Sequence, residues 1–286
     1  MAEQLYTIPI NEAFDEKEGC PLCRLRQKLE DQSLKYIMGA AMMEPDIRIV
    51  TNQLGFCRTH FHKMLGMGNR LSLALMLESH LDSVAALVPE ESNQKPGRLG
   101  KLKKYDGDSP APQLMAQAES CYVCRRAAEF EKKYVSNVIY IWKKDAAFQE
   151  KLRAQPYFCL EHTAALLEQG QKDLSEAAYL AFSKDVLALA RKQLKELRAH
   201  VTEFCRSFDH ENAGKPLSQE AKHSVEDTVA FLSGDFQRNL RGQWYCHRRL
   251  YHRYSRNRSN PDRNPRRPLS SQGVAGGQRR RDHQGR

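Results

Sequence analysis

A cysteine motif that occurs twice constrains this chain more than any other feature. Residues 20–23 read CPLC and residues 121–124 read CYVC, and each motif is followed by an aromatic residue and a Cys-x-x-His motif. The later motifs occupy residues 57–60 and 159–162, after 33 and 34 intervening residues respectively. The two copies start 101 residues apart and contain six of the eight cysteines. A spacing that is kept in two copies indicates an internal repeat.

The repeated residues are those of a four-coordinate metal site. A Cys-x-x-Cys motif places two thiolates on one ion, and Cys-x-x-His at the start of a helix places sulfur and imidazole on one face. Three thiolates and one imidazole suit tetrahedral zinc, and four protein ligands are typical of a structural site. The sequence therefore predicts two zinc ions per chain. We assign Cys20, Cys23, Cys57 and His60 to one ion and Cys121, Cys124, Cys159 and His162 to the other, and pairing across the copies remains open.

Other proteins use Cys-x-x-Cys for different chemistry. Covalent haem needs a histidine directly after the motif, where this chain has Arg24 and Arg125. A thioredoxin-type redox pair belongs to a βαβ context, and strand signals are nearly absent from this sequence. An iron–sulfur cluster with one histidine ligand stays open, because ligand softness alone does not separate iron from zinc. His62 follows the first Cys-x-x-His motif, but Ala164 stands at the matching place of the second copy, so we expect His62 not to bind.

The rest of the chain has the apolar periodicity of helices. We predict an all-α protein of two tandem zinc-stapled helical repeats packed as a bundle, with a disordered C-terminal tail. The expected divisions are a first repeat at 1–88, a linker at 89–117, a second repeat at 118–237 and an Arg-rich tail at 238–286. Apolar stripes from Leu73 to Val88 and from Val186 to Phe208 are expected to pack the repeats against each other. Residues 5–10 (LYTIPI) are predicted to form a short extended arm, and Cys205 is predicted to be buried.

The positive charge of the chain is confined to its C-terminal end. Residues 238–286 contain 14 arginines, no lysine and two acidic residues, a net charge of +12, whereas the whole chain carries +10. Residues 1–237 therefore carry −2, which does not indicate a nucleic-acid-binding body. Two explanations of the tail remain open: a basic arm that binds nucleic acid nonspecifically, or an altered C-terminus without a selected function. The abrupt loss of lysine favours the second explanation.

Sequence motifs of common enzymes are missing. There is no G-x-S-x-G, no H-E-x-x-H and no Walker-type glycine loop. No apolar run reaches the roughly 20 residues of a membrane span, and the N-terminus does not resemble a signal peptide, so we expect a cytoplasmic protein. The composition thus favours a non-catalytic binding or scaffold protein with an unknown protein partner and no membrane association. The alternative is a thiol-dependent redox or metal-responsive protein that uses the same cysteines.

Several stretches resemble one bacterial family in the same order along the chain. They are LYTIPINEAF, CPLC, YIMGAAMMEPDIR, LGFCRTHF, NRLSLALMLESHL, and CYVC with FCLEH. The family is catalogued as domain of unknown function number six thousand and sixty-two, and the resemblance runs from about Leu5 to about Asp235. It implies a cytoplasmic bacterial protein with paired Cys/His motifs and no assigned reaction. The Arg-rich tail departs from the family pattern.

Overall fold

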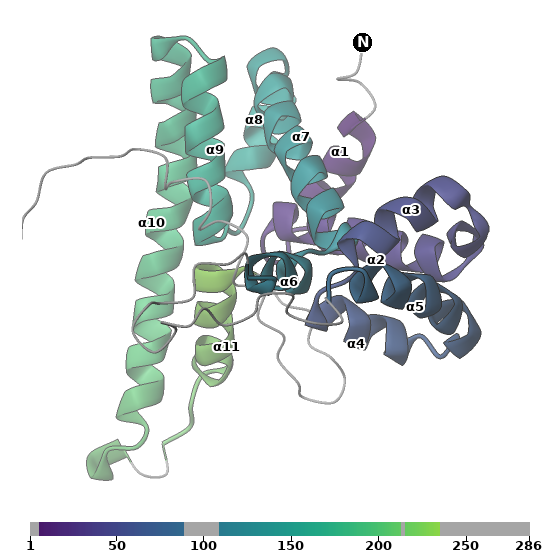
Figure 1. Ribbon diagram of the computed structural model, residues 1–286. Coiled ribbons are helices and arrows are strands. Elements are labelled where there is room, and N and C mark those ends of the chain that lie inside the picture. The colour runs from purple at the N-terminus through teal and green to yellow at the C-terminus, as the bar shows by residue number, and fades with distance from the viewer. Residues whose placement is uncertain (1–5, 89–108, 213–214, 235–286) are drawn as a thin grey trace, which may run out of the picture. The chain divides into compact units, whose positions relative to one another are not determined.

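The computed structural model describes residues 6–88, 109–212 and 215–234 of the 286-residue chain (Figure 1). These residues form eleven α-helices and no β-strand, which confirms the predicted all-α class. The helices of the first half are α1 (Thr7–Asp15), α2 (Pro21–Met38), α3 (Pro45–Leu54), α4 (Arg58–Gly66) and α5 (Arg70–Ala85), with a 3₁₀ helix η2 at Ala40–Met43. Those of the second half are α6 (Ala111–Glu119), α7 (Tyr122–Lys144), α8 (Ala146–Arg153), α9 (Leu160–Asp173), α10 (Glu176–Arg206) and α11 (Gln219–Ser233), with a 3₁₀ helix η3 at His210–Asn212. Helix α6 begins within the segment expected to be a linker.

Helix boundaries follow residues that suit helix ends. Pro21 and Pro45 occupy the first positions of α2 and α3, where a missing backbone N–H costs nothing. The hydroxyl of Ser218 accepts a hydrogen bond of 3.1 Å from the backbone N–H of Ala221 and caps α11. Gly234, with φ of 92°, ends the same helix.

Helices α2 and α7 pack against each other and join the two copies of the repeat. Arg26, early in α2, lies 3.2 Å from Glu131 in the middle of α7. Tyr36, near the end of α2, lines the same cavity of about 170 Å³ as Tyr122 at the start of α7. Residue numbers therefore rise along one helix while they fall along the other, so α2 and α7 run antiparallel.

Two apolar cores form, and each mixes residues from both copies. One core combines Leu22, from the start of α2, with Phe148, Phe158 and Phe182 of the second half. The other combines Ile37, Phe56 and Met64 of the first half with Val123, from the start of α7. Each fully buried side chain of this size stabilises the fold by about 1.5–3 kcal/mol. The start of each long helix thus belongs to the core of the other half.

The two apolar stripes do not pack against each other, so the prediction that the repeats meet through them is wrong. Helix α5 packs against α3 and α4, while α10 lies alongside α9 and contacts α11 (Figure 1). The far end of the first stripe is solvated, because Leu81 and Val88 are 62% and 54% exposed. Leu73 of the first stripe and Val186 of the second lie instead in the two mixed cores, and the helices that follow the Cys-x-x-Cys motifs, α2 and α7, pack the copies against each other.

Two local predictions are also wrong. The stretch expected to be an extended arm enters helix α1 at Thr7, and Ile10 and Phe14 of that helix are fully buried. Pro9 is tolerated because it lies in the first turn, where backbone N–H groups lack intrahelical partners. Cys205 is exposed rather than buried. It follows Leu197 by eight residues, which turns it about 80° away from that buried side chain.

Some expectations fall on residues without a described structure. The predicted disordered tail at 238–286 and Cys246 lie outside the described residues. Within the ranges that the structure describes, no helix is both long enough and apolar enough to cross a membrane.

Candidate metal centres

The eight predicted ligands come together in two groups of four. The outer site, whose ligands flank the others along the chain, contains Cys20, Cys23, Cys159 and His162. The inner site contains Cys57, His60, Cys121 and Cys124. The ligand atoms of each group lie within 4.8 Å of one another. Each site thus takes its Cys-x-x-Cys from one copy and its Cys-x-x-His from the other, and our assignment of ligands within each copy is wrong.

Helix lengths explain why the ligands cross between the copies. Helix α2 carries the chain about 27 Å away from its Cys-x-x-Cys motif, whereas α3 is only about 15 Å long and cannot lead the chain back over that whole length. In the second half α7 spans about 35 Å and α8 about 12 Å. The Cys-x-x-His motif of each copy is therefore placed short of its own Cys-x-x-Cys. Because α2 and α7 are antiparallel, the start of the other long helix lies there instead.

All four cysteine motifs lie at the starts of helices. Cys20 and Cys121 are the N-caps of α2 and α7, and Cys57 and Cys159 are the N-caps of α4 and α9. At each Cys-x-x-His motif, the histidine three residues later shares a face of the helix with the cysteine. The backbone N–H of Tyr122 donates to the carbonyl of Gly55 over 3.0 Å, which ties the two motifs of the inner site together.

The distances between ligand atoms fit one tetrahedral ion in each group. Metal–sulfur bonds of about 2.3 Å place two sulfurs about 3.8 Å apart. The Sγ atoms of Cys23 and Cys159 are 3.6 Å apart, and those of Cys57 and Cys124 are 3.7 Å apart. The sulfur–nitrogen distances of 3.0–3.4 Å fall slightly short of the roughly 3.5 Å expected around zinc. The residues present therefore fit a single metal ion at each site.

A buried carboxylate stands behind each histidine. Nδ1 of His60 and of His162 faces the sulfurs, so Nδ1 is the nitrogen available to a metal. Nε2 of His60 lies 3.5 Å from Glu30, and Nε2 of His162 lies 2.9 Å from Glu131. A carboxylate behind a ligating imidazole fixes the tautomer and the orientation of the ring. This arrangement is characteristic of metal-binding histidines.

Sequence reasoning missed both carboxylates, although a signal existed. Glu30 and Glu131 each lie ten residues after the first cysteine of their motif, so they occupy equivalent places in the two copies. Glu30 lies in α2, which contributes cysteines to the outer site, but it approaches His60 of the inner site. Glu131 lies in α7, which contributes cysteines to the inner site, but it approaches His162 of the outer site. A glutamate within a helix is usually solvated, so the equivalent places of Glu30 and Glu131 did not by themselves indicate a role at the metal sites.

Electrostatics favour positive charge at the centre of each group. Burial lowers the pKa of His60, but hydrogen bonds with Cys121 and Cys57 outweigh it and raise the pKa to about 11. Burial also lowers the pKa of His162, yet the charge of Cys20 and a hydrogen bond with Cys159 hold it well above the ordinary value. A divalent cation would supply this positive charge and would keep the thiolates deprotonated.

The two sites differ in exposure. All four ligands of the outer site are buried, whereas Cys57 of the inner site is partly exposed. Hydrogen bonds with Cys121 and Cys124 lower the pKa of the Cys57 thiol, although burial opposes this. Cys57 is thus the ligand thiolate that solvent reaches most easily. His62 belongs to neither group and is exposed, as expected.

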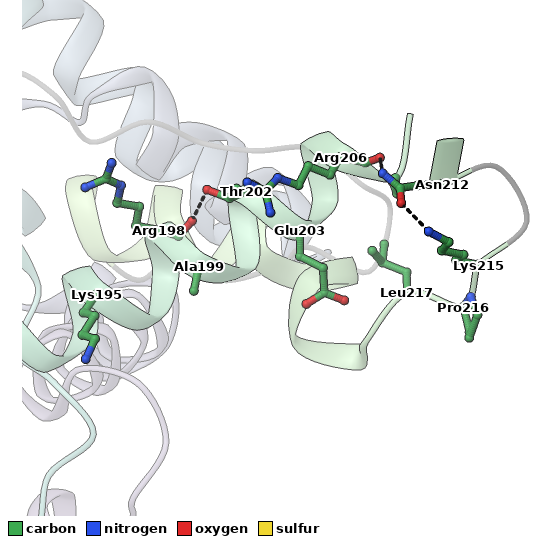
Figure 2. A pocket seen from close by; sticks show the side chains of 11 residues that line it. Lys195, Arg198, Ala199, Thr202, Glu203, Arg206, Asn212, Lys215, Pro216 and Leu217 are labelled. Atoms are coloured by element: carbon green, nitrogen blue, oxygen red, sulfur yellow. Dashed lines mark hydrogen bonds between the residues drawn. The ribbon is translucent and has the colours of Figure 1, made fainter. Parts of the chain in front are cut away.

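A groove between the end of α10 and the segment before α11 is a further candidate site among the described residues. Its volume is about 540 Å³, and Lys195, Arg198, Arg206 and Lys215 contribute positive charge to its lining (Figure 2). The side chains of Lys195 and Arg198 point away from one another in Figure 2 and do not converge on a ligand. Glu203 accepts hydrogen bonds from the backbone and the hydroxyl of Ser218 there. The side-chain contacts from Ser218 in this groove are those of a helix cap.

One protein family matches most of the chain. The model of DUF6062, a family of unknown function, matches residues 1–239, which include all eight residues of the two sites. No curated protein and no solved structure matches the chain.

Proposed function

The chain belongs to this family of unknown function, and we propose from the geometry of its sites that it is a zinc-binding helical protein. Each chain binds two structural zinc ions and acts as a non-catalytic scaffold. The observation that carries this proposal is the pair of crossed Cys₃His groups, each backed by a buried glutamate. Four protein ligands leave no coordination position for a substrate, which is the pattern of structural zinc.

The compactness of each group supports one ion rather than an iron–sulfur cluster. All four ligand atoms lie within 4.8 Å of one another. A cluster of several irons places metal and sulfide between the cysteines and therefore needs a wider cage. Thiolate and imidazole together suit zinc among the single ions.

Metal analysis of the purified full chain tests the proposal. We expect two zinc ions per chain and a lower melting temperature after chelation, because structural zinc contributes on the order of 10 kcal/mol in small zinc domains. A chain without stoichiometric metal, or with mainly iron, would refute the zinc assignment. Capture of proteins from the native organism, with zinc-loaded and chelated chain compared, tests whether a partner depends on the metal-bound fold.

A second function has one observation in its favour. The partly exposed Cys57 thiolate, with its lowered pKa, suits a redox or metal-responsive protein. Hydrogen peroxide would oxidise Cys57 and Cys124, 3.7 Å apart, to a disulfide. The two thiolates would give up two electrons, and with two protons from the solvent these would reduce the peroxide to two waters as the zinc leaves.

Mild peroxide treatment separates the two functions. A scaffold keeps both zinc ions, whereas a sensor releases zinc from the inner site and gains one disulfide. A Cys205→Ser/Cys246→Ser background removes the two cysteines of the sequence that belong to neither site. Retention of both ions in that background would exclude the sensor function.

A further inference from the structure

One guanidinium lies between the carboxylates that orient the two histidines. Nε of Arg26 is 3.4 Å from Glu30, and its Nη1 is 3.2 Å from Glu131. The side chains of Arg26, Glu30 and Glu131 are 16%, 3% and 6% exposed. A path of charged groups therefore runs from His60 through Glu30, Arg26 and Glu131 to His162, and no step exceeds 3.5 Å.

Arg26 has no counterpart in the second copy of the repeat. The residue 101 positions later is Ala127, so a single arginine serves two equivalent glutamates. Glu30 also lies 3.3 Å from Lys63. Among the described residues, Arg26 is the one lysine or arginine within 4.0 Å of Glu131. The outer site thus depends on Arg26 more than the inner site does.

The chemistry of arginine makes this link stiff. Its guanidinium is planar and always charged, and its donors have fixed directions. A carboxylate that moves on one edge of the guanidinium displaces the group, and with it the carboxylate on the other edge. Groups behind metal-ligating histidines typically change metal affinity by 10–100-fold. A disturbance at one site can therefore reach the ligands of the other.

We propose that Arg26 couples the two metal centres, so that an ion in one site strengthens binding of the ion in the other. This inference rests on the proposed function, since it requires both sites to bind zinc. Coupling of this kind is reciprocal, because each ion changes the affinity for the other by the same factor. Arg26 acts through the two glutamates and is a positioning residue rather than a ligand.

Zinc affinity of the inner site, measured in the full chain by competition with a chromophoric chelator, tests the coupling. Cys23→Ser disables the outer site, and we expect it to weaken the inner site about 10-fold in the otherwise unchanged chain. Arg26→Met removes the link and should weaken both sites. In the Arg26→Met background, Cys23→Ser should have no further effect on the inner site.

Lys63→Met is the matched control. Lys63 contacts Glu30, so its loss should weaken the inner site but keep the Arg26 link, and Cys23→Ser should weaken the inner site further in this background, as it does in the parent chain. The coupling is overturned if Cys23→Ser weakens the inner site equally in the parent chain and in the Arg26→Met background, or if Arg26→Met leaves the outer site unchanged. If Arg26→Met lacks the helical circular dichroism of the parent, Arg26→Lys is used instead. Lysine keeps the positive charge but lacks the planar guanidinium with its fixed donor directions. A parent chain that binds no zinc would refute the proposed function instead.

Discussion

Pairs of cysteine substitutions distinguish crossed ligand groups from groups within each copy. Cys23 and Cys159 belong to the outer site, and Cys57 belongs to the inner site. The double variant Cys23→Ser/Cys159→Ser should therefore keep one zinc ion, because both changes fall in one site. The double variant Cys23→Ser/Cys57→Ser should keep none. Pairing within the copies predicts the reverse for both double variants.

The structure also sets the expected loss of stability. The outer site joins Cys23 to Cys159, 136 residues apart, and the inner site joins Cys57 to Cys124, 67 residues apart. Treated as chain cross-links, they restrict the unfolded state by about 5 and about 4 kcal/mol respectively. Either figure is a large part of the roughly 5–15 kcal/mol that stabilises a typical domain. Loss of either ion should thus lower the melting temperature strongly, and loss of the outer ion slightly more.

Native mass spectrometry counts the ions on the folded chain, and thermal melts follow the stability. Cys205→Ser is the matched control, because this cysteine belongs to neither site and should leave two ions bound. If Cys23→Ser/Cys57→Ser retains one ion while Cys23→Ser/Cys159→Ser retains none, the crossed arrangement is refuted.

Three further predictions concern single residues. Replacing His60 by alanine should remove the inner ion, as elemental analysis would show, whereas His62→Ala should leave both ions; equal losses would contradict the ligand assignment. Gly55→Ala should destabilise the chain by about 1–3 kcal/mol in denaturant melts, since φ is +56° and an added Cβ would lie 2.6 Å from His80; Gly66→Ala, with open space around it, should have little effect. Hydrogen bonds from the backbone N–H and the hydroxyl of Ser218 lower the pKa of Glu203. The stability that ionised Glu203 contributes is therefore present above the ordinary glutamate pKa and is lost as the pH falls through the lowered value. NMR titration should show Glu203 titrating at lower pH than the other exposed glutamates, and an ordinary midpoint would contradict the cap.

The ligands could be predicted from the sequence because their spacing occurs twice. How they pair could not, since it depends on the lengths of α2, α3, α7 and α8 and on the antiparallel packing of two of them. Glu30 and Glu131 could have been predicted as well, because their equivalent places in the two copies are visible in the sequence.

Arg26 gave no such signal, since its counterpart in the second copy is Ala127 and its importance comes from contacts across the helix pair. The mistaken arm at residues 5–10 has a similar cause. Pro9 and neighbouring β-branched residues suggest extended backbone, but burial of Ile10 and Phe14 against the second half favours the helix.

The nested order of the ligands has a consequence for how the protein is made. Cys20 and Cys23 are the first ligands to leave the ribosome, yet their partners are the last, 136 or more residues later. The inner site has all four ligands once Cys124 has been synthesised, whereas the outer site must wait for His162. Until then the nascent chain carries Cys20 and Cys23 without the full ligand set of their site. The inner centre can thus close first, and the outer centre can close only once the start of α9 has joined the chain.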